Sequence, residues 1–144
     1  MEYMIVIMVI IFFLGSASFI IPSKKTKFLA QLRLDAAKLG FKISSLAHSK
    51  ISFQSKDLNL ASYQLKNKSN IKEAHFIKDK DQFILYSPSR LKYSDDYETT
   101  LEKIQELPDS INEIIFSNSV LVFLWNENLG INELEKINSN LKKL

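Results

Sequence analysis

Mostly apolar residues form a long run near the start of the chain, from Tyr3 to Ile21, without a formal charge. At a rise of about 1.5 Å per helical residue, the run reaches roughly 28 Å, close to the ~30 Å hydrocarbon core of a bilayer. A helix satisfies its own backbone hydrogen bonds, so such a segment can span lipid. The pattern therefore predicts a transmembrane anchor over residues 1–22, followed by a soluble domain over residues 23–144.

A cleaved signal peptide is the alternative interpretation of the same run. The small residues Gly15–Ser18 resemble a signal-peptidase site. However, the only side-chain charge before the run is Glu2 instead of a positive n-region, and the apolar residues continue to Ile21. These two features favour an intact anchor.

Basic residues follow the run at once and predict its orientation. Lys24, Lys25, Lys27 and Arg33 lie near its C-terminal end, and the positive-inside rule keeps such a flank in the cytoplasm. We expect a single-pass membrane protein with its N-terminus outside and its C-terminal domain in the cytoplasm. The same four side chains are the candidate contacts for anionic lipid headgroups.

Helical periodicity begins after Pro22. Phe28, Leu32, Ala36 and Leu39 recur at spacings of four, four and three, which gives one apolar face. The next residue is a glycine, which suits a helix end. The pattern predicts a juxtamembrane helix over residues 24–39.

Strand patterns and two further helices fill the remainder of the chain. Strand-like segments occur at residues 41–46, 51–54, 61–66, 74–78, 82–86, 111–116 and 120–125. The last of these is almost entirely apolar, which is typical of a central strand covered on both sides. Helical patterns begin near Ser94, ending before Pro108, and again after Gly130. The fold class is therefore α+β: a small antiparallel sheet packed with about three helices, behind a transmembrane helix.

Composition narrows the chemistry. The net charge is +3, yet residues 24–92 hold 15 basic against 5 acidic residues, and residues 95–144 hold 4 against 10. The basic half suits contact with anionic lipid headgroups. A solvated protein surface, on which the basic and acidic halves attract each other, explains most of these charged residues better. The chain has no Cys, which excludes disulfides and thiolate metal sites.

Catalytic motifs are missing from the sequence. The three glycines are isolated, so no phosphate-binding loop is present. His48 and His75 lie far apart without a second ligand at metal spacing, and His75 is expected to be a half-buried structural residue. Aromatic residues interleave with lysines between Tyr63 and Tyr86, which suits nucleic-acid stacking, but core packing explains them better. We expect a protein that is not an enzyme and that has no cofactor or metal.

Two resemblances follow from short motifs. The apolar run with Ile21–Lys27, leading to Leu39–Phe41, resembles the start of the YajC-type accessory subunit of bacterial preprotein translocase. Leu107–Pro108 and Trp125–Glu127 resemble a set of short bacterial single-pass inner-membrane proteins to which no activity is assigned. These resemblances imply a fold and a location in the bacterial inner membrane, with the N-terminus outside and the C-terminal domain in the cytoplasm.

The expected function is that of a non-catalytic adaptor or accessory subunit of a membrane complex, with protein translocation as one candidate. Its partners would be the lipid bilayer, a membrane protein and anionic headgroups. The alternative is a membrane-anchored binding module for anionic lipid or nucleic acid, with nucleic acid the less favoured of the two.

Overall fold

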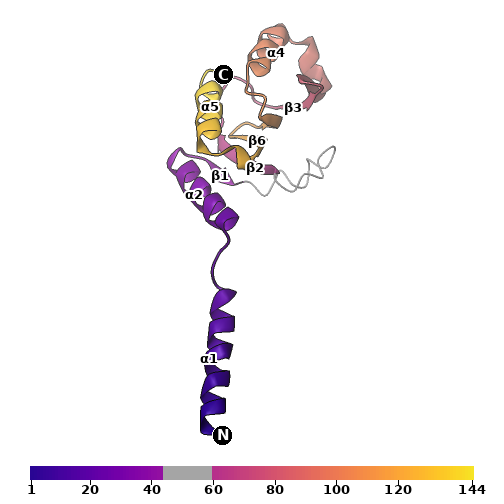
Figure 1. Cartoon of the computed structure of the whole chain (residues 1–144). Helices are drawn as coiled ribbons and strands as arrows, with labels where there is room; N and C mark the ends of the chain where they lie inside the picture. Colours follow the sequence, from indigo (N-terminus) through magenta and orange to yellow (C-terminus); the bar gives the residue numbers. More distant parts are fainter. Residues whose placement is uncertain (44–59) are drawn as a thin grey trace. The chain divides into compact units, whose positions relative to one another are not determined.

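A computed structural model of the chain describes residues 1–43 and 60–144. They form two compact units, Met1–Gln31 and Leu32–Leu144. The described α-helices are α1 (Glu2–Ser18), α2 (Lys24–Lys38), α4 (Tyr97–Gln105) and α5 (Ile131–Leu141), with 3₁₀ helices η1 (Ser89–Tyr93) and η2 (Glu127–Leu129) (Figure 1). The strands are β1 (Lys42–Ile43), β2 (Leu60–Lys66), β3 (Ala74–Asp79), β4 (Gln82–Ser87), β5 (Ile111–Phe116) and β6 (Val120–Asn126).

The N-terminal helix α1 is shorter than the sequence predicts. It has 17 residues and ends at Ser18. Pro22 disfavours helical geometry in the residue before it, so the helix does not continue to the end of the apolar run. Among the described residues, no helix combines the length and the apolar character needed to cross a membrane. The predicted transmembrane anchor over residues 1–22 is therefore wrong, and so are the single-pass topology and the inner-membrane location that depended on it.

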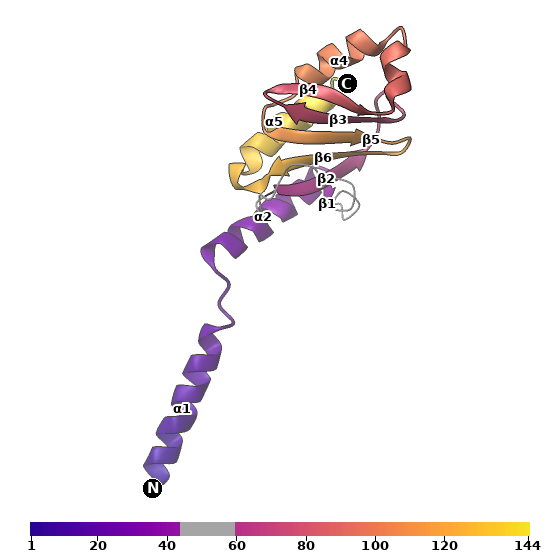
Figure 2. The ribbon, with the colours of Figure 1, turned by 90° about the vertical axis from the view of Figure 1, so that its right-hand side faces the viewer.

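The predicted α+β class and antiparallel sheet are confirmed. The strands form one sheet in the order β1-β2-β6-β5-β3-β4, and all their pairings are antiparallel (Figure 2). β6 lies inside the sheet, paired with β2 on one side and β5 on the other. Residues Leu121–Trp125 are all buried, on both faces of the strand. The prediction of a central strand here is correct.

One row of large apolar side chains runs across the sheet. Tyr63, Phe123, Ile114, Phe76 and Leu85 are successive Cα partners across β2, β6, β5, β3 and β4, so they share one face. All five are buried. Their alignment makes the row a continuous core, because cross-strand partners lie close enough for their side chains to pack.

Helices cover this face of the sheet with the apolar sides that the sequence predicts. In α5, Leu134, Ile137 and Leu141 are buried, and both views show α5 lying against one face of the sheet (Figures 1 and 2). In α2, Leu32 and Ala36 are buried. The earlier part of the predicted α2 stripe differs, since Phe28 keeps 44% of its surface exposed.

The predicted hairpin between β3 and β4 is confirmed. Lys80 and Asp81 have φ values of 45° and 70° in the connecting turn, the left-handed geometry that tight hairpins require. The strand expected over residues 51–54, the polar loop around His48 and the end of the strand expected over residues 41–46 lie outside the described residues.

Replacing Trp125 tests the core. Its side chain is fully buried, its ring centroid lies 5.5 Å from that of Tyr63, and its indole N–H has no acceptor among the described residues. We expect Trp125→Ala to lower the free energy of unfolding by about 3–5 kcal/mol, as measured by urea denaturation. The control Tyr93→Ala, at a residue 88% exposed, should change it by less than about 0.5 kcal/mol. Unchanged stability in Trp125→Ala would contradict this assignment.

Candidate functional site

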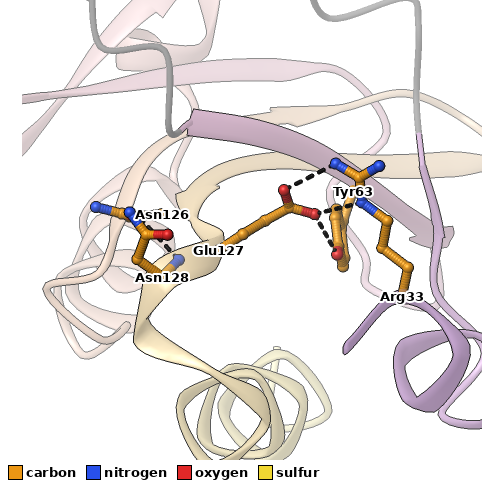
Figure 3. Close-up of polar contacts among 5 residues, drawn as sticks. All are labelled: Arg33, Tyr63, Asn126, Glu127 and Asn128. Carbon is orange, nitrogen blue, oxygen red and sulfur yellow. Dashed lines mark hydrogen bonds and ion pairs between the residues drawn. The ribbon is translucent and has the colours of Figure 1, made fainter. Parts of the chain in front are cut away.

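Three side chains from distant parts of the chain meet at one end of the sheet (Figure 3). Arg33 in α2 donates from Nε and Nη2 to the two carboxylate oxygens of Glu127, each at 2.9 Å. The hydroxyl of Tyr63 in β2 donates to Oε1 of the same carboxylate at 2.7 Å. This arrangement, the Arg33–Tyr63–Glu127 cluster, joins α2, β2 and η2.

Local structure explains why the carboxylate reaches this position. Glu127 directly follows β6, whose last residue Asn126 pairs with Leu60 at the start of β2. The side chain of Asn126 accepts a hydrogen bond from the backbone N–H of Asn128 at 2.9 Å, which turns the chain into η2. The turn places Glu127 at the end of the sheet, within reach of Tyr63.

The cluster keeps its carboxylate ionised. Burial alone would raise the pKa of Glu127, but the hydrogen bonds from Arg33 and Tyr63 outweigh burial and hold this pKa below its ordinary value. Burial, followed by the hydrogen bond to Glu127, raises the pKa of Tyr63. The hydrogen bond to Glu127 raises the pKa of Arg33. All three groups therefore keep their ordinary charge states near neutral pH, which suits a structural tie better than proton transfer.

The four residues predicted to contact lipid separate into two groups. Lys24, Lys25 and Lys27 are exposed in the first turn of α2. Arg33 lies further along α2 and forms the ion pair with Glu127. Lipid contact by the four residues stays a prediction, and the guanidinium of Arg33 already has a partner within its own domain.

A second buried polar pair lies on neighbouring strands. His75 in β3 forms a hydrogen bond through Nε2 with Oε1 of Glu113 in β5, and both side chains are buried. The ring of Tyr86 packs edge-on against His75, with 5.0 Å between the ring centroids. The prediction that His75 is a structural residue of a strand agrees with these contacts, although it is more deeply buried than expected. In the described parts of the chain, no group of three His, Cys, Asp or Glu side chains could hold a metal ion.

The largest exposed apolar surface described in the chain belongs to α1. None of its residues is buried, and its apolar side chains from Tyr3 to Leu14 keep between 48% and 84% of their surface exposed. Successive helical residues are rotated by about 100°, so this uninterrupted run is apolar on every side. We call these residues the α1 surface.

Comparison of the chain with protein families, with curated proteins and with solved structures finds no match. The candidate sites therefore depend on geometry alone. Sequence reasoning placed Glu127 in a short motif but missed its role. The available signal was an acidic residue directly after a wholly apolar strand. A carboxylate at that position lies beside the core, where its burial is costly unless a cation pairs with it.

Replacing Glu127 tests the cluster and its pH dependence. Because the folded-state pKa of Glu127 lies below its ordinary value of 4.5, its ionised form stabilises the fold at higher pH, and this stabilisation is lost as the pH falls through the folded-state pKa. Glu127→Gln should therefore lower the free energy of unfolding by about 1–3 kcal/mol near neutral pH. The difference from wild type should shrink as the solution is acidified below the ordinary pKa.

The matched control is Glu73→Gln. Glu73 forms an ion pair with Arg90 in which both side chains are largely exposed, so its loss should cost less than about 1 kcal/mol. Urea titrations across acidic and neutral pH measure both variants. A stability difference for Glu127→Gln that does not vary with pH would contradict the role of the charge.

Proposed function

We propose that the chain is a non-catalytic adaptor, an accessory subunit that binds a larger protein through the α1 surface. The observation that carries this proposal is the exposure of an apolar helix along its length: α1 has no buried residue, whereas the folded unit Leu32–Leu144 buries large apolar side chains in a core. The resemblance of the N-terminal region to a translocase accessory subunit supports a role of this kind.

Hydrophobic burial supplies the driving force for such binding. Each large apolar side chain transferred from water into a protein contact contributes about 1.5–3 kcal/mol, and α1 presents such side chains over more than two turns. Contiguous exposed apolar surfaces of this extent mark interaction sites. The free energy of binding must also offset the loss of translational and side-chain freedom. The long apolar run of α1 offers enough surface to do so.

The partner that fits is a protein with an apolar cavity that surrounds the helix. If copies of α1 associated with one another, each helix would still turn one apolar side to water, because a ring of single helices has an outer face. A surrounding cavity leaves no such side. Lys24, Lys25 and Lys27 follow α1 within the same unit, so acidic residues at the mouth of the cavity would complement them.

The buried carboxylates of the folded unit are held in structural contacts, which supports a role in binding more than one in catalysis. Glu127 is fully engaged by Arg33 and Tyr63, and Glu113 is hydrogen-bonded to His75. The alternative role in nucleic-acid binding draws less support, because Tyr63 and Phe76 of the predicted stacking surface lie in the core.

Polar substitutions on two opposite sides of α1 test the proposal. Ile10→Gln with Phe13→Gln alters one side, and Met8→Gln with Phe12→Gln alters the other. We expect either pair to weaken binding at least about tenfold, since each removes two buried apolar side chains. The partner is identified by crosslinking and copurification, and the dissociation constants are then measured with the two purified proteins.

Two exposed apolar residues of the folded unit supply the control. Ile84→Gln with Tyr93→Gln removes comparable apolar surface outside α1 and should leave the affinity unchanged. Loss of binding for only one of the two α1 pairs would mean that the partner covers one side of the helix. Binding that depends on α1 but is reproduced by protein-free lipid vesicles, or by a second copy of the chain, would overturn the proposal.

A further inference from the structure

A cavity of about 400 Å³ opens in the folded unit, at the end of the sheet where β2 finishes. Its apolar walls come from separate elements: Leu39 follows α2, Leu65 belongs to β2, Leu121 to β6 and Leu141 to α5. Cavities of about 300–1,000 Å³ with mostly apolar walls and few polar groups are typical of small-ligand sites. The size of this cavity and its leucine walls therefore suit a small molecule with an apolar part.

One buried polar residue lines the cavity. Asn138 lies on the apolar side of α5 beside Leu134 and Leu141, and only 8% of its surface is exposed. Its side chain lines the cavity and carries an N–H donor group and a carbonyl acceptor. An amide inside a leucine-lined cavity can hydrogen-bond a polar atom that a ligand supplies.

Three lysines line the same cavity. Lys66 ends β2, Lys68 follows it in the connecting loop, and Lys142 follows α5. All three are exposed, and none forms an ion pair with a described residue. No Asp or Glu side chain lines the cavity, so its electrostatic potential favours an anion.

We propose that this cavity binds a small amphipathic carboxylate, with an apolar tail against the leucines and a single anionic head. Asn138 and Lys142 are four residues apart at the end of α5 and therefore project from the same side. One carboxylate can accept a hydrogen bond from the amide of Asn138 and be neutralised by Lys142. Lys66 and Lys68 add positive charge from the sheet side. This site is separate from the α1 surface and does not depend on its role.

The probe is decanoate, which carries an alkyl tail and one carboxylate, and the comparison compound is decanol, which has the same tail without charge. Binding to the full chain is measured by isothermal titration calorimetry, and contacts are located by NMR. We expect decanoate to bind about tenfold more tightly than decanol, since an ionised head meets three lysines. The largest shifts should occur at the Asn138 side-chain amide and at the methyl groups of Leu65, Leu121 and Leu141.

Two variants separate the head-group contacts from the fold. Changing Lys66, Lys68 and Lys142 together to Gln should weaken decanoate binding about tenfold and leave decanol binding unchanged. The matched control changes Lys72, Lys80 and Lys92 to Gln; these exposed lysines do not line the cavity, and they make the same change in net charge. Decanoate binding to this control should match that of wild type at physiological salt.

Asn138→Leu supplies an independent test. The substitution removes the amide, so it should weaken decanoate binding several-fold, and the thermal midpoint of unfolding shows that the variant remains folded. No detectable binding of decanoate at millimolar concentration would overturn the proposal. It would also be overturned by equal binding of decanol, by equal losses in the two lysine triple variants, or by shifts centred outside the cavity.

Discussion

The pairing of β6 with β2 on one side and β5 on the other is the constraint on which the folded unit depends. β6 contributes buried side chains to both faces of the sheet, and its partners place Tyr63 and Ile114 beside Phe123. A slip of one residue would turn each of these side chains to the opposite face. The register of this strand therefore determines the composition of the core and the position of every residue that follows β6.

Glu127 is the first residue whose position depends on that register. A carboxylate at this depth loses much of its hydration, and the loss of either donor would leave a buried acceptor partly unsatisfied. Arg33 and Tyr63 offset the desolvation, and in doing so they join the second half of α2 to the end of the sheet. A bidentate arginine pair also specifies direction, so the cluster selects how the end of α2 meets the sheet as well as holding it there.

The two proposed binding surfaces differ in how they arise. The cavity beside Asn138 forms where α2, β2, β6 and α5 come together and do not fill the space between them. The α1 surface instead results from an apolar segment that the folded unit does not bury. A partner that surrounds α1 would bury a long apolar helix, whereas the cavity admits only a small molecule with a charged head. One chain can therefore carry both without competition between them.

The sequence by itself determined the elements whose signals are local. The helical spacing of Leu32 and Ala36 predicted the buried side of α2, the polar run around Lys80 predicted the β3–β4 hairpin, and the continuous apolar run of β6 predicted an inner strand. These features depend on residues within one or two turns of each other, so periodicity and turn chemistry are sufficient to find them. The same reasoning took α1 for a membrane span, because hydropathy does not show where a helix ends.

Only the tertiary structure decided the contacts between distant residues. The order of the six strands, the pairing of Arg33 with Glu127 across 94 positions and the placing of Asn138 among leucines from other elements are not encoded in any local pattern. Each arises when strand register and helix packing bring separate segments together. The physical reason is that a charge or an amide gains its role from the groups that surround it, and in this fold those groups come from other parts of the chain.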